Sequence, residues 1–139
     1  MARYLFNVVS GDAAEAAALL RLGMWGIDAE ERHRDSLAGG DLVLIYLGAP
    51  KLEFIGRAEL SSTARDWTAS EARAYPGDSP GGVLLAKVEE WDPPVPMSAV
   101  LPRIDPSEKA KAEFETAVVR ITAGEYETAL TVAAERAAL

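Results

Sequence analysis

The sequence contains no cysteine and a single histidine among its 139 residues. The lack of cysteine excludes disulfides, thiolate nucleophiles and cysteine-based zinc sites, and it fits a reducing compartment, so we expect a cytoplasmic protein. His33 has no second histidine at metal-ligand spacing, and the sequence holds no nucleophile-elbow or phosphate-loop motif. We therefore expect no enzymatic activity, no metal site and no cofactor.

Long apolar runs are missing as well. No uninterrupted apolar segment approaches the roughly 20 residues that cross a bilayer. The N-terminal apolar run is interrupted at Asn7 and is too short for the apolar region of a signal peptide. We expect a protein without membrane contact. Its length and 49% hydrophobic composition fit one domain over residues 1–139, which we expect to be a monomer.

Positive charge is scarce, with 14 Lys and Arg residues against 22 Asp and Glu residues and a net charge of −8. Domains that hold nucleic acid mainly through phosphates present a basic surface, so any nucleic-acid binding by this chain must be local. Arg32, His33 and Arg34 form a short basic segment just after Trp25 and are the candidate phosphate contacts. The structural alternative is that they are solvated charges on the surface of a helix.

What the sequence does contain is a regular succession of strand and helix patterns. Apolar and β-branched runs bounded by turn residues predict strands at 3–9, 41–47, 51–61, 83–91 and 118–121. Capping residues before helix formers predict helices at 13–22, at 28–37, from 108 to 115 after Ser107, and at the C-terminus after the capping box of Thr122 and Glu125.

The central strands define the expected sheet. Residues 41–47 are almost continuously apolar, which predicts a strand buried on both faces. The short connection to 51–61 predicts an antiparallel hairpin, and Gly56 in mid-strand indicates a bulge or a close approach to the backbone. The order of elements predicts an α+β fold, a small, curled, mostly antiparallel β-barrel flanked by helices.

Glycine and proline interrupt the second half of the chain. The polar segment 62–82 is either an ordered insertion or a mobile lid, with at most two helical turns near 69–74. The run Asp92-Pro93-Pro94-Val95-Pro96 is expected to end the strand that precedes it, because proline cannot donate to a sheet.

Five segments together resemble the EVE domain of the PUA-like superfamily, which also contains the YTH RNA readers. They are Tyr4-Leu5-Phe6, Trp25-Gly26-Ile27, Arg32-His33-Arg34, Gly40-Asp41 before a strand that reaches Tyr46, and Phe54-Ile55-Gly56-Arg57-Ala58. The resemblance implies a β-barrel with a pocket that accepts a flipped or single-stranded modified base of DNA or RNA. It also implies, for some prokaryotic members, a nuclease partner.

The candidate residues for this pocket are polar or aromatic: Asn7, Ser10, Trp25, Gly26, Tyr46, Phe54, Trp67 and Tyr75. Each has a structural alternative. Trp25 is either a ligand wall or a core indole, and the resemblance favours the wall. Asn7 reads a base edge or makes a structural hydrogen bond, and Ser10 fits a helix cap better than a ligand contact. Trp67 and Tyr75 close the pocket or simply pack the insertion.

Three classes of function remain open. The first is a reader of a modified base. The second is a regulatory or interaction domain that binds a small planar ligand, or a protein partner through its acidic surface. The third is an enzyme in the same cleft, for which the sequence offers no nucleophile–base pair. A positively charged lip built from Arg32 and Arg34 would favour the first class over the second.

Overall fold

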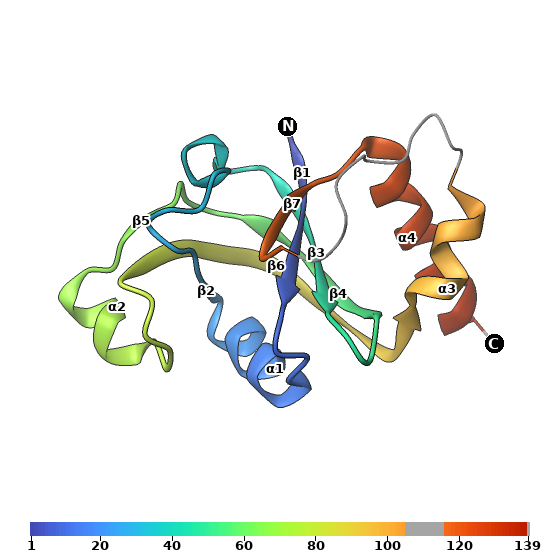
Figure 1. Ribbon diagram of the computed structural model, residues 1–139, viewed down its shortest axis with the longest axis horizontal. Helices are drawn as coiled ribbons and strands as arrows, with labels where there is room; N and C mark the ends of the chain where they lie inside the picture. Colours follow the sequence, from blue (N-terminus) through green and yellow to red (C-terminus); the bar gives the residue numbers. More distant parts are fainter. Residues whose placement is uncertain (105–115, 139) are drawn as a thin grey trace.

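A computed structural model describes residues 1–104 and 116–138 of the chain. It shows an α+β fold in which a curled mixed sheet forms a half-barrel flanked by helices (Figure 1). Seven strands run in the order β2-β6-β4-β3-β1-β7, with β5 paired to β6. Their bounds are Arg3–Val8 (β1), Met24–Gly26 (β2), Leu42–Leu47 (β3), Glu53–Leu60 (β4), Arg65–Asp66 (β5), Gly81–Pro96 (β6) and Val118–Arg120 (β7). The expected fold class is confirmed.

Four α-helices lie in the described part of the chain, at Ala13–Leu22 (α1), Ala69–Ala74 (α2), Met97–Val100 (α3) and Ala123–Ala137 (α4). Helix α1 begins after Asp12, whose carboxylate accepts from two backbone N–H groups, and ends at Gly23 in the left-handed conformation. Helix α4 opens with the predicted capping box of Thr122 and Glu125. None of these helices is long and apolar enough to cross a membrane.

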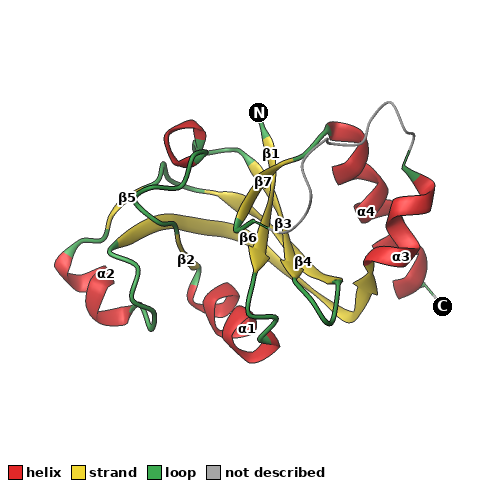
Figure 2. Ribbon diagram, viewed as in Figure 1, coloured by secondary structure: helices red, strands yellow, loops and turns green. Residues whose placement is uncertain are grey.

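The sheet separates two hydrophobic cores, because alternate residues of each strand point to opposite faces. Tyr4 and Phe6 of β1 join the core beneath α1, whereas Leu5 joins the core beneath α3 and α4. In Figure 2, α1 lies on a different side of the sheet from α3 and α4. Strand β3, between β1 and β4, is buried on both faces, and the predicted hairpin of β3 with β4 is confirmed.

Gly56 marks a close approach of two backbones. It pairs with Glu90 of β6, and a Cβ at this position would collide with the carbonyl oxygen of Glu89. The pairing of β4 with β6 shifts register beside it. Both features expected at Gly56, a bulge and a close approach, are therefore present.

The helix expected at 28–37 is wrong. Backbone bonds from Glu31 to Asp28 and from Arg34 to Glu31 make successive turns, followed by a 3₁₀ helix, η1, at Arg34–Ser36. Between Ile27 and Leu37, which are both buried, the segment has only Ala29 as an apolar residue. A helix here would have no apolar face to bury, and a short helix without packing is unstable in water.

The expected end of the strand at 92–96 is also wrong, because β6 continues to Pro96. Val95 pairs with Phe54 and Pro96 with Glu53, but the ladder then shifts and resumes only at Glu90. The prolines at 93 and 94 fall in this gap, where no partner strand needs their missing N–H groups. A second 3₁₀ helix, η2, follows α3 at Leu101–Arg103. The helix predicted at 108–115 lies outside the described residues.

Candidate functional site

Trp25 is both a core residue and the wall of a pocket. It lies on β2 opposite Val83 of β6, and its ring stacks on Phe6 with 5.9 Å between centroids and 25° between planes. Only 6% of its surface is exposed. One face of the indole is therefore occupied by Phe6, and a small remaining part of the side chain borders the pocket.

The pocket beside Trp25 has a volume of about 310 Å³. It is lined by Trp25, Gly26, Ile27, Asp28, Glu30, Glu31, Ala117 and Val118. The last two residues reach it because Val118 of β7 pairs with Phe6, on which Trp25 stacks. Ligand pockets begin at about 300 Å³, so this one suits a single small planar group.

The lip of this pocket is acidic. Asp28, Glu30 and Glu31 line it, and among the described residues the lining includes no arginine, lysine or histidine. Their carboxylates make no hydrogen bond or ion pair to another described residue. The sequence predicted a helix at 28–37 that contains these acids, so their position in the pocket was missed.

The expected basic residues lie elsewhere. Arg34 directs its Nη2 to Oδ1 of Asp66 on β5 at 3.7 Å, and its side chain is only 19% exposed. The ring of His33 meets the edge of Tyr4 with 6.1 Å between centroids. Arg32 is exposed on the loop. The positively charged lip that would have favoured a phosphate-gripping reader is not part of this pocket.

Trp67 and Tyr75 attach the insertion to β2 instead of lining the pocket. The Tyr75 hydroxyl accepts a hydrogen bond from the Gly26 amide at 3.0 Å, and its ring lies 5.1 Å from that of Trp67. The indole Nε1 of Trp67 donates to the carbonyl of Ser79 at 3.0 Å. Burial raises the pKa of the Tyr75 hydroxyl. Tyr75 therefore contacts a pocket residue, Gly26, without lining the pocket itself, and Trp67 packs against Tyr75.

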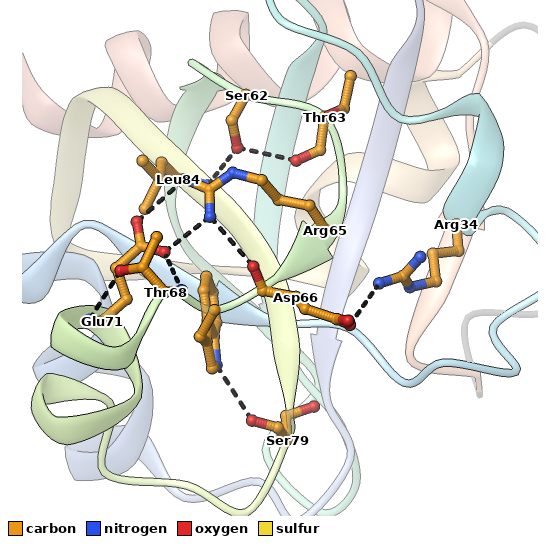
Figure 3. A network of polar contacts seen from close by, with 10 residues as sticks. Arg34, Ser62, Thr63, Arg65, Asp66, Thr68, Glu71, Ser79 and Leu84 are labelled. Carbon is orange, nitrogen blue, oxygen red and sulfur yellow. Dashed lines mark hydrogen bonds and ion pairs between the residues drawn. The ribbon is translucent and has the colours of Figure 1, made fainter.

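A polar network makes 62–82 an ordered insertion (Figure 3). Arg65 donates to both carboxylate oxygens of Glu71, at 2.7 and 3.0 Å, and also to the carbonyl of Asp66. Glu71 in turn closes the capping box of α2 with Thr68, a box that was not anticipated from the sequence, although up to two helical turns were expected near 69–74. The bond from Arg65 and the backbone bond from Thr68 lower the pKa of Glu71 to about 2.

The remaining candidates do not meet at the Trp25 pocket. Tyr46 and Phe54 pair across β3 and β4 with 5.1 Å between ring centroids, in the core beneath α3 and α4. Burial raises the pKa of Tyr46 to about 12. Asn7 is buried beside Tyr46 in the ladder of β1 and β3. Ser10 is exposed and accepts from the Asp12 amide at 3.3 Å before α1.

A second concave region, of about 390 Å³, lies between β6 and α4 and was not anticipated. Trp91 contributes its indole, whose Nε1 donates to Glu89, and the other oxygen of Glu89 accepts from Arg57 at 3.1 Å. Alanine and leucine side chains of α4 form the opposite side. The sequence gives no local signal for it, because it depends on the packing of two elements about 40 residues apart. Among the described residues, no group of three acidic, histidine or cysteine side chains could hold a metal ion.

The half-barrel with its flanking helices is a fold that several solved structures share. Similar solved structures include a protein from Leishmania major (TM-score 0.67, 17% identity, 99% of this chain and 97% of that chain) and an NMR structure from Rhodopseudomonas palustris (0.64, 16%, 97% and 94%). They also include ASCH from Zymomonas mobilis (0.55, 16%, 94% and 94%). No family model and no curated protein sequence matches the chain. At these identities the likeness establishes the fold.

Proposed function

We propose that this protein is a nucleic-acid-binding module of the EVE type that accepts one modified base, flipped or unpaired, in the Trp25 pocket. The observation that carries the proposal is a pocket for one planar group, bordered by an indole, in a fold whose likeness to PUA-like structures extends over nearly the whole chain. Unstacking a base costs a few kcal/mol, and base–aromatic stacking returns about 1–3 kcal/mol.

The polar side of the pocket supports reading of a base edge. Carboxylates accept hydrogen bonds from exocyclic amino groups, as Asp and Glu do with cytosine N4. Glu31 is half-buried and Asp28 and Glu30 are exposed, so the three acceptors differ in their exposure to solvent. Arg32 is the candidate for a neighbouring phosphate. We propose binding without chemistry, so that cleavage of a bound strand would fall to a partner nuclease.

The acidic lip favours a second candidate function, the binding of a free planar ligand. A base within a strand brings two phosphates near the pocket mouth, where Asp28, Glu30 and Glu31 repel them. A free base or nucleoside would not meet this repulsion. The two functions therefore differ in whether the phosphates of a strand add to affinity or subtract from it.

Isothermal titration calorimetry can separate them, with a panel of modified nucleosides and the same bases placed in short single strands. We expect the strand to bind more tightly than its nucleoside. Equal or weaker binding of the strand would favour the free-ligand function, and no binding of either would contradict both.

The contribution of Trp25 needs a matched control, because the same residue stabilises the core. Trp25→Leu should weaken binding by about tenfold or more through loss of the aromatic contact. Phe6→Leu disturbs the same stack from beneath but lines no part of the pocket, so its affinity should stay near that of the wild type. Equal losses in both variants would mean that Trp25 acts through packing alone.

A further inference from the structure

We infer that the Trp25 pocket selects a base that carries a positive charge, as a ring-N-methylated base does. This inference rests on the proposed function and specifies its ligand. Asp28, Glu30 and Glu31 all line the pocket, and a backbone bond from the amide of Glu31 to the carbonyl of Asp28 closes the turn that carries them. Apart from Gly26, the other described lining residues are apolar or aromatic, so the charge of the described lining is of one sign.

Some other acidic side chains of the molecule are paired with a cation. Glu71 is paired with Arg65, Glu89 with Arg57, and Glu135 with Arg103. These carboxylates are neutralised within the fold.

The pocket carboxylates are not neutralised by any described residue. The neighbouring cations are directed elsewhere, since Arg34 lies against Asp66 and His33 against Tyr4. Glu31 is half-buried beside an apolar wall, and its carboxylate therefore interacts more strongly with a charge than a fully exposed one would, because the local dielectric constant is lower. A ligand that brings a positive charge would supply the missing partner.

The chemistry of the lining then discriminates among bases. An ionised carboxylate can only accept hydrogen bonds, so it opposes a base edge that presents only carbonyl and ring-nitrogen acceptors. The indole of Trp25 and the apolar residues Ala117 and Val118 accept a flat ring whichever base it belongs to. A delocalised positive charge on that ring gains from the carboxylates and, where it reaches the indole face, from the cation–π attraction.

Two isomers test this inference directly. 1-Methyladenosine is protonated and carries a positive charge at neutral pH, whereas N6-methyladenosine has the same heavy atoms and is neutral. Calorimetric titration at pH 7 and low salt, with each isomer as a nucleoside and within the same short single strand, compares charge at constant size. We expect the cationic isomer to bind more tightly by about tenfold.

Removing the pocket charge should remove this preference. The double variant Glu30→Gln with Glu31→Gln keeps the shape of both side chains and should bring the affinity ratio of the two isomers close to one. Glu127→Gln is the control, because it removes a charge from an exposed position on α4 that does not line the pocket. This control should leave the ratio unchanged, and thermal melting should confirm that each variant is folded.

The outcomes separate the inference from the proposed function. If strands bind but the neutral isomer binds as tightly, or the ratio survives the double Gln variant, the inference is wrong and the reader function stands. If the cationic nucleoside is preferred but the strand adds no affinity, the inference stands and the free-ligand function replaces the reader. If no nucleoside or strand binds, both proposals are overturned.

Discussion

At the scale of single residues, the contact between Gly26 and Tyr75 connects the pocket to the insertion. Gly26 lines the pocket, and its amide donates to the Tyr75 hydroxyl. A Cβ on Gly26 would collide with that hydroxyl and crowd Ser79. Glycine is therefore required here by the position of a side chain about 50 residues further along, and not by a positive φ angle.

The first prediction concerns this pair. Tyr75→Phe should lower the free energy of unfolding by about 1 kcal/mol, because the Gly26 amide loses its acceptor. Gly26→Ala should also destabilise the fold, and the double variant should cost less than the sum, since both single changes break the same contact. Urea denaturation of the three variants measures this. Strict additivity would mean that the two residues are not coupled.

The second prediction concerns pH. The pKa of Glu71 is lowered from 4.5 to about 2, chiefly by the bond from Arg65 and then by the Thr68 backbone. Because the folded value lies below the unfolded one, the carboxylate stabilises the insertion above pH 4.5, and this contribution is lost as the pH falls toward 2. Hydrogen-exchange protection of α2 should exceed that of Glu71→Gln near neutral pH and converge with it near pH 2. A difference that persisted at pH 2 would contradict this assignment.

At the scale of elements, two helices begin with the same capping box but differ in burial. Helix α2 buries none of its residues, whereas α4 buries Tyr126, Ala129 and Val132 against the core. The same capping box therefore begins an exposed helix in α2 and a helix packed against the core in α4. Loss of the capping box should destabilise only the helix itself in α2, whereas in α4 it should destabilise the whole fold.

The third prediction follows from that contrast. Thr122→Ala should lower the global free energy of unfolding by about 1 kcal/mol, the usual cost of a lost cap. Thr68→Ala should raise hydrogen exchange within 69–74 and leave global stability within about 0.5 kcal/mol of the wild type. Denaturant melts and exchange on both variants provide the comparison. Equal global losses would show that α2 unfolds together with the core.

The elements that the sequence predicts well are those with local signals. Helix α1 has its cap at Asp12 and its stop at Gly23, and β3 has a continuous apolar run. Strands β2 and β5, of 3 and 2 residues, could not be predicted, because so short a strand exists only through its pairing with β6. The acidic pocket depends on the same pairing. The sequence identified Trp25 as a candidate but not the acids that face the ligand space beside it.

At the scale of the whole molecule, one strand supports both cores. Val43 and Ile45 of β3 belong to the core beneath α1, and Leu44 and Tyr46 to the core beneath α3 and α4. A charge placed on β3 would therefore be desolvated whichever face it pointed to. The two cores cannot be expected to unfold independently while this strand is shared.

The fourth prediction tests the shared strand. Leu44→Asp should cost more than about 4 kcal/mol and leave the domain largely unfolded, because it buries an unpaired charge. Val88→Asp is the control, since Val88 is an exposed apolar residue on β6 and should tolerate the change. Circular dichroism and thermal melting distinguish the two. A cooperatively folded Leu44→Asp protein would contradict the burial of this strand.

The fifth prediction uses the net charge of −8. If a strand is held by one base and a phosphate or two, few counterions are released. The slope of log affinity against log salt should then be about −0.7 to −1.4. Arg32→Ala should flatten it, whereas Arg73→Ala, exposed on α2 and outside the pocket, should not. A steep slope in the Arg32→Ala variant would mean that another surface of the protein contacts the phosphates of the strand.

The three tryptophans occupy three different environments, and this gives the molecule a built-in set of optical probes. Trp25 borders one pocket, Trp91 borders the other, and Trp67 is fixed by its bond to Ser79 within the insertion. Replacing two of them with phenylalanine leaves a single emitter at a known place. The emission of the Trp25-only protein should then respond to a ligand in its pocket while that of the Trp91-only protein stays constant, so that the position of a bound molecule can be determined in solution.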